Sequence, residues 1–170
     1  MSTLQHIEPL VKNEDILLRT ITNETKKVTG FNFFNALTIS LQRYYGCKYV
    51  LIGKHDHETD IVTTCSVAVN NKIVDNISYS LESTPCAGVV DQKTCYYPND
   101  VDKLFPQDQL LLDMGVKSYL GIPVFCENIS EGILIIMDDK NLHINKNEQK
   151  VIELFADRTG AEFSRIYQDG

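Results

Sequence analysis

Two cysteines in the middle of the chain are the residues whose chemistry most directly suggests a function. Cys86 and Cys95 are nine residues apart, and Cys95 is followed by Tyr96 and Tyr97. Such a stretch can form a thiol active site, a metal or chromophore pocket, or a packed cap over a core. A thiol reacts only where it is accessible and partly ionised, so residue types alone leave these interpretations open. For Cys86 a buried thiol behind the helix-starting Pro85 is favoured, whereas for Cys95 a buried and a functional thiol are equally supported.

The cysteines as a set give no disulfide or zinc pattern. There are five of them, an odd number without C-x-x-C spacing: Cys47, Cys65, Cys86, Cys95 and Cys126. In a reducing compartment such residues are usually free and buried, where they pack like small apolar side chains. We therefore expect no structural disulfide.

A second group of chemically active side chains lies in a polar loop between two predicted strands. His55 and His57 alternate there with the carboxylates of Asp56, Glu58 and Asp60. A His-x-His pair can chelate a metal, but a metal site also needs converging ligands and supporting hydrogen bonds. Nothing else in the sequence points to this loop. We interpret it as a solvated hairpin tip and predict no metal site.

Composition and charge narrow the class of protein. The chain has 170 residues, 43% hydrophobic and 23% charged, which is typical of a globular domain that needs no disulfide staple. Its net charge is -7, and its Lys and Arg residues are scattered, so nucleic acid and anionic membrane are not expected partners. No apolar run approaches the length of a membrane span, and the first residues lack a signal-peptide pattern. We predict a cytoplasmic protein.

The elements that must position these residues follow from hydrophobic periodicity and turn signals. Apolar spacing predicts two helices before Gly46, the first interrupted at 13–15, and three antiparallel strands after it. An irregular segment with two short helices comes next, then two strands and a long final helix. In order, the predicted elements are 7–21, 34–45, 48–54, 61–69, 73–81, 84–91, 107–114, 118–124, 133–137 and 145–166. The run 133–137 is apolar on both faces, which indicates a central strand, whereas Pro123 indicates an edge or irregular position.

At this point the sequence resembles a known family. The resemblance depends on T-P-C at 84–86, C-x-Y-P at 95–98, L-F-P at 104–106 and S-Y-L-G-I-P-V at 118–124. These motifs resemble the GAF domain of bacterial signalling proteins, and the similarity extends over about residues 16–165. Together the motifs are fairly specific, although each alone would be weak.

The resemblance implies an α+β fold with a GAF-like central antiparallel β-sheet. The N- and C-terminal helices would cover one face, and a helix-capped pocket would lie on the other. The implied division is an N-terminal helical segment, 1–30, followed by the GAF domain, 31–168. The inserted segment 81–115 would line the pocket, and we expect Cys86, Cys95, Tyr96, Tyr97 and Tyr119 to bind the ligand.

The function implied by the resemblance is a non-catalytic sensory or regulatory domain in signal transduction. It would bind an unidentified small molecule, with no cofactor specified, and would relay the signal through its terminal helices. In this family a histidine kinase, or a diguanylate cyclase or phosphodiesterase of cyclic-di-GMP signalling, typically follows; that output is expected outside this chain. A second stripe on the last helix, Val151, Leu154 and Ala161, could meet a partner helix and form a homodimer.

Four alternative functions stand beside this interpretation. Cyclic-nucleotide binders of this superfamily use Asn-Lys, Phe and Asp-Glu, where this chain has Asp139-Lys140, Ile144 and Asn147-Glu148. Bilin binders commonly have His after the attachment cysteine, where this chain has Tyr96. The free methionine-(R)-sulfoxide reductase is an enzyme with cysteine chemistry, for which Cys86, Cys95 and Cys126 invite comparison, but its surrounding motifs are absent. The fourth alternative is a ligand-free dimerisation module.

Overall fold

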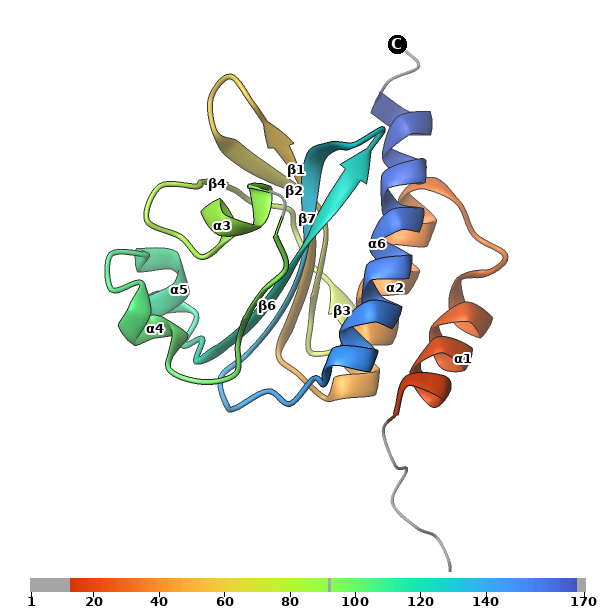
Figure 1. The fold of residues 1–170 in the computed structure, drawn as a ribbon, viewed down its shortest axis with the longest axis horizontal. Coiled ribbons are helices and arrows are strands. Elements are labelled where there is room, and N and C mark those ends of the chain that lie inside the picture. The colour runs from red at the N-terminus through yellow and green to blue at the C-terminus, as the bar shows by residue number, and fades with distance from the viewer. Residues whose placement is uncertain (1–12, 92, 168–170) are drawn as a thin grey trace, which may run out of the picture.

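A seven-stranded antiparallel sheet forms the centre of the molecule (Figure 1). The structure, a computed structural model, describes residues 13–91 and 93–167. The strand order is β3-β2-β1-β7-β6-β5, with β4 also paired to β2. The strands are β1 Tyr49–Asp56, β2 Ile61–Val69, β3 Lys72–Ile73, β4 Ser78–Ser80, β5 Cys95–Tyr97, β6 Ser118–Cys126 and β7 Ile129–Asp138.

Helices cover both faces of this sheet. Figure 1 shows the longer helices α1, α2 and α6 on one side and the short helices α3, α4 and α5 on the other. Their bounds are α1 Glu14–Thr25, α2 Gly30–Tyr45, α3 Cys86–Val90, α4 Val101–Leu104, α5 Gln109–Asp113 and α6 Lys146–Tyr167. The predicted α+β class, with terminal helices on one face, is therefore confirmed.

The sheet separates two hydrophobic cores because side chains alternate across each strand. We call the core under α1, α2 and α6 the helix-side core, and the core under α3, α4 and α5 the cap-side core. On β7, Leu134 and Ile136 pack into the first, while Ile133 and Ile135 pack into the second. The strand lies between β1 and β6, so the predicted central strand is confirmed.

The long helix α6 begins where the sequence predicts. The Asn145 and Glu148 side chains each accept a hydrogen bond from the other's backbone N–H, at 2.8 and 3.0 Å, and these two bonds form a capping box. At its inner face Ile152, Thr159 and Phe163 are fully buried. This helix therefore packs along the sheet as its apolar stripe predicts.

Of the predicted interruption at 13–15, Glu14 and Asp15 are the first residues of α1, and Asn13 lies outside the helix. Asn13 is the N-cap of α1, and its side-chain oxygen accepts hydrogen bonds from Asp15 N and Ile16 N, both at 3.0 Å. A polar cap and a polar interruption look alike in a sequence, because both break the apolar stripe. The upstream part of the predicted helix, including Ile7, Leu10 and Val11, lies outside the described residues.

The hairpin after β1 is tighter than predicted, and the third strand is split. Residues 54–56 pair with residues 61–63, so β1 extends into the polar stretch while β2 begins at Ile61 as predicted. Downstream, Thr64 donates from its amide to Ile77 O and accepts at its hydroxyl from Ile77 N, at 2.9 and 2.8 Å. Because the Thr64 hydroxyl takes the Ile77 N–H, the chain between β3 and β4 does not continue the regular hydrogen-bond pattern of the sheet. The predicted continuous strand therefore does not form.

Two short elements were missed. Cys95 to Tyr97 form β5, which pairs with residues 119–121 of β6 and leaves Pro123 beyond its end. Residues 99–103, between the two predicted short helices, contain the start of α4, where Val101 is fully buried. Elements of three or four residues are too short to show a period, so the sequence could not reveal them. None of the described helices is long and apolar enough to cross a membrane.

Candidate functional site

A small cavity lies between the sheet and the short helices α3 and α5. Its volume is about 30 Å³. Two of its walls are apolar side chains from the sheet and from α5, and the third is the start of α3. The lining residues are Leu51, Ile77, Tyr79, Pro85, Cys86, Asp108, Leu110, Leu111, Met114, Tyr119, Ile135 and Met137.

The polar centre of this cavity is a thiol between two phenols. The Cys86 sulfur lies 2.9 Å from the Tyr119 hydroxyl and 3.4 Å from the Tyr79 hydroxyl. Burial raises the pKa of the Cys86 thiol to about 11, although hydrogen bonds from both hydroxyls lower it. Burial also holds the pKa of Tyr119 and of Tyr79 well above the usual value. All three groups are therefore neutral hydrogen-bonding groups at neutral pH.

Asp108 supplies the negative charge of the cavity. Its side chain caps α5 by accepting a hydrogen bond from Leu111 N at 3.1 Å. Burial raises the pKa of this carboxyl, and the capping bond lowers it. Its charge is also among the smaller causes that raise the pKa of Cys86 and Tyr79, behind burial. Among the described lining residues there is no Lys, Arg or His to neutralise it.

The structure brings together only some of the five predicted site residues. Cys86 and Tyr119 line the cavity. Tyr97 lies behind it, its ring 6.1 Å from that of Tyr119, and Cys95 is partly buried in the same cap-side core. Tyr96 points to the opposite face, where its hydroxyl donates to Leu142 O and accepts from Ile144 N. The ligand-binding role of these residues stays a prediction.

Sequence reasoning missed Asp108 and Tyr79. A signal for Asp108 existed, because Asp directly before a helical run is a preferred N-cap, but the predicted helix was not assigned a cap. Tyr79 lies in the predicted strand 73–81, and the sequence gives no indication of what its side chain contacts. Its contact with Cys86 depends on how α3 folds back over β4, which no local pattern encodes.

Of the three cysteines proposed for a reductase, Cys126 lies on the opposite side of the sheet from Cys86 and Cys95. Cys86 belongs to the cap-side core, whereas Cys126 lies in the helix-side core with its sulfur 3.4 Å from Gly160 O. Burial raises the pKa of Cys86, Cys95 and Cys126 alike. A thiolate attacking group and a nearby resolving thiol are therefore not preassembled from Cys86 and Cys126.

The histidine loop has its own local pairing. His55 is buried, and its Nε2 lies 3.0 Å from Asp60 Oδ1. His57 Nε2 lies 3.3 Å from Glu131 Oε1 on β7. Within 13–91 and 93–167 no group of three or more His, Cys, Asp or Glu side chains is arranged to hold a metal ion.

Thiol alkylation should distinguish Cys95 from Cys86. We expect iodoacetamide at about pH 8 to modify Cys95 first, because its side chain is partly exposed while Cys86 is buried with a pKa of about 11. Peptide mass spectrometry over time measures both rates, with the unfolded protein in denaturant as the reference. Modification of Cys86 at the rate seen in the unfolded protein would contradict its burial.

The Asp108→Asn variant should show a pH-dependent gain in stability. Because burial raises the pKa of this carboxyl, the contribution that it makes to stability is full below the unfolded pKa and is lost as pH rises through the folded pKa. Asparagine keeps the cap without a charge. In urea unfolding the variant should therefore gain stability relative to the wild type as pH rises above about 4, the usual pKa of an unfolded Asp. If the difference in unfolding free energy between the variant and the wild type did not change with pH, ionised Asp108 would carry no cost of burial.

Together, the fold and the cavity define the class of this protein. It is an α+β domain in which a helix-capped cavity and the terminal helices lie on opposite faces of one antiparallel sheet. The family model described as GAF domain matches residues 13–163. The chain therefore belongs to the GAF domain family.

One curated relative shares sequence similarity with most of this chain. Hybrid signal transduction histidine kinase F of Dictyostelium discoideum is 22% identical over 136 residues, which cover 78% of this chain and 11% of that protein. This chain thus spans only a small part of that relative. The family and this relative support a sensory or regulatory role in signal transduction.

The solved structures share the fold at low identity. The GAF domain of phosphoenolpyruvate-protein phosphotransferase from Acinetobacter has a TM-score of 0.75 at 13% identity, covering 94% of this chain and 99% of that one. Free methionine-R-sulfoxide reductase from Neisseria meningitidis, in complex with its substrate, has a TM-score of 0.75 at 12% identity. The match covers 98% of this chain and all of that one. At this identity the likeness establishes the fold alone.

Proposed function

We propose that this chain is a non-catalytic sensory domain that binds a small molecule in the cavity under α5. Binding would change the position of the terminal helices and thereby the activity of an output domain. The observation that carries the proposal is the hydrogen-bonded set of Cys86, Tyr79 and Tyr119, enclosed with Asp108 in an apolar cavity. Buried polar groups of this kind give a ligand orientation, while the apolar walls give it affinity.

The helix α5 is the part of the cap best suited to open. In this five-residue helix Leu111 is buried, whereas Leu110 and Leu112 remain 39% and 40% exposed. The Tyr49 hydroxyl adds one further tie by donating to Met114 O at 3.0 Å. A cavity of about 30 Å³ accommodates little more than water, so a larger ligand requires this helix to move. Ligand binding is thus coupled to a change in the cap.

The sheet offers a short route from the cavity to the last helix. Tyr119 lines the cavity, and its neighbour Leu120 is fully buried in the helix-side core. At the other end of β6, the Cys126 thiol donates to Gly160 O of α6 at 3.4 Å. A shift of β6 would therefore reach α6 through direct contacts, which supports a relay through that helix.

The partners of this domain follow from its exposed helices and its relative. Leu18 of α1 and Leu154 of α6 are 40% and 58% exposed, which favours a homodimer formed through the terminal helices. The histidine kinase relative favours a kinase output, with a cyclic-di-GMP enzyme of bacterial signalling as the other candidate. Such a protein would act in the cytoplasm.

Native mass spectrometry of the purified chain tests the sensor proposal. We expect an adduct that disappears on denaturation, together with protection of residues 107–115 from hydrogen exchange when the adduct is present. The Cys86→Ser variant, which keeps a hydroxyl-sized donor, is the matched probe of the cavity. A bare protein with no thermal shift across a metabolite panel would instead support a ligand-free dimerisation module.

The second candidate function is that of the reductase of similar fold, although that likeness shows the fold alone. A reductase would consume free methionine-(R)-sulfoxide in the presence of a thiol reductant, with Cys95 or Cys126 required. The raised pKa of both thiols argues against this reaction. Turnover that is lost in the Cys95→Ser or Cys126→Ser variant would overturn the non-catalytic proposal.

A further inference from the structure

We infer that the ligand of this cavity is a small, mainly apolar amine whose cationic group pairs with Asp108, and that anionic ligands are rejected. This inference rests on the proposed sensory function and names the chemical class of its ligand. It follows from three properties of the cavity: the sign of its charge, the state of its neutral donors, and the nature of its walls.

The charge of the cavity favours a cation. Asp108 is the acidic group among the described lining residues, and no basic side chain accompanies it there. Its partly buried carboxylate is costly to ionise, as the raised pKa shows. An ammonium group would offset that cost by forming a charge-assisted hydrogen bond, whereas a phosphate or carboxylate would add a second uncompensated charge.

The thiol and the two phenols of the cavity are not free to stabilise a bound anion. The Cys86 sulfur is already within hydrogen-bonding distance of both Tyr79 and Tyr119. A carboxylate would have to break these contacts while facing Asp108 across a small space. A ligand with a single amine can pair with Asp108 and leave the contacts of Cys86 with both tyrosines intact, with its apolar part against the cavity walls.

The side chains that line the cavity favour a ligand that is mostly apolar. Leu51 and Ile135 project from the sheet, and Leu111 and Met114 project from the end of α5 toward the same space. Met114 and Met137 are flexible side chains that can repack around a ligand of unfixed shape. Because Asp108 caps the same helix that must move, an amine bound there would tie the opened cap to the ligand.

Three probes of nearly equal shape separate the charge states. Benzylamine, benzyl alcohol and benzoate share one ring and differ in carrying a positive charge, no charge or a negative charge. We would titrate each into the full chain and follow amide and methyl shifts of Leu111 and Met114 by NMR. We expect benzylamine to bind about tenfold more tightly than benzyl alcohol, and benzoate to cause no saturable shift.

Two variants of α5 test the role of the carboxylate. Asp108→Asn keeps the helix cap but removes the charge, and should make benzylamine and benzyl alcohol bind equally. Asp113→Asn removes an exposed charge from the same helix and should leave the preference unchanged. A preference for benzylamine that survives in Asp108→Asn would overturn the assignment of this residue.

The remaining outcomes separate the ligand class from the sensor proposal. Benzoate binding as tightly as benzylamine would overturn the amine class but leave the cavity as a sensory site. Absence of binding by all three probes would also overturn the amine class. The sensor proposal would then be decided separately by the native mass measurement, since an adduct of another chemical class would still support it.

Discussion

The Glu162→Gln variant is expected to lose about 2–3 kcal/mol of unfolding free energy and roughly 5–10 °C in melting temperature. Glu162 is fully buried on α6, and Oε1 accepts a hydrogen bond from Gly30 N at 2.9 Å. Its Oε2 pairs with the guanidinium groups of Arg158 and Arg165, both at 3.2 Å. Glutamine keeps the volume but leaves both cations without their buried partner and turns an amide N–H toward one of them.

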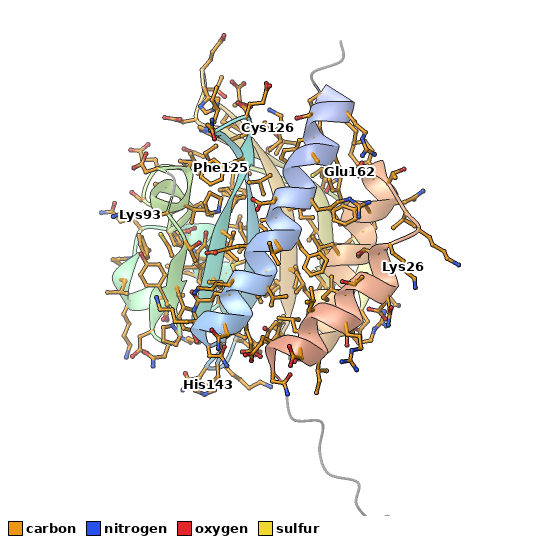
Figure 2. The ribbon with its side chains drawn as sticks, turned by 45° about the vertical axis from the view of Figure 1, so that its right-hand side comes forward. Lys26, Lys93, Phe125, Cys126, His143 and Glu162 are labelled. Carbon is orange, nitrogen blue, oxygen red and sulfur yellow. The ribbon has the colours of Figure 1, made fainter. Side chains whose placement is uncertain are left out.

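This carboxylate joins the last helix to the start of α2, as its position in Figure 2 between α6 and the N-terminal helices illustrates. Arg158 extends the same connection by donating to Val28 O at 2.8 Å. Local loosening should therefore appear as faster hydrogen exchange at the Gly30 amide. Chemical unfolding and exchange would be measured beside Asp157→Asn, which removes an exposed charge from α6. Equal stability of the two variants would show that Glu162 does not hold these helices together.

The parts of the fold that the sequence predicts are those with long periodic patterns. The apolar stripe of α6 and the doubly apolar run of β7 each depend on burial along a whole element. Their tertiary environment is nearly uniform, so local pattern and final structure agree. The strand β5 and the split between β3 and β4 were missed because three residues carry no period and because Thr64 competes for the backbone of Ile77.

The candidate site was predictable only in part, for a geometric reason. Cys95, Tyr96 and Tyr97 were treated as one group, yet consecutive residues of a strand face opposite sides, and Tyr96 therefore lies in contact with the helix-side core. Once β5 is known to be a strand, this separation follows. The pairing of Cys86 with Tyr79 and Tyr119 joins three elements, so it depends on tertiary structure and not on spacing.

Glu162 illustrates the same limit on α6. In the sequence it lies beside the inner stripe and would be expected at the surface, since charged residues are rarely fully buried. Its burial is possible because the amide of Gly30 and two arginines surround it. The hydrogen bond of Gly30 to a residue far along the chain is not visible in any local sequence pattern.

The Gly160→Ala variant is expected to be destabilised by about 3 kcal/mol, even though alanine favours a helix over glycine by about 1 kcal/mol. A Cβ at this position would lie 2.0 Å from the carbonyl oxygen of Phe125 on β6. The obstacle is backbone within a paired strand, so it cannot rotate away like a flexible side chain. Relief requires α6 to move off the sheet, near the positions of Phe125 and Cys126 that Figure 2 labels.

The control for this variant is Asp157→Ala, which places alanine on the exposed side of the same helix and should change stability by less than about 0.5 kcal/mol. Urea unfolding gives both values, and alkylation of Cys126 reports local opening, because its sulfur lies 3.4 Å from Gly160 O. Faster alkylation of Cys126 together with reduced stability would show that the contact between α6 and β6 has opened. If Gly160→Ala were instead as stable as wild type, α6 could adjust its distance from β6 at little cost, and a relay through their direct contact would lose its physical basis.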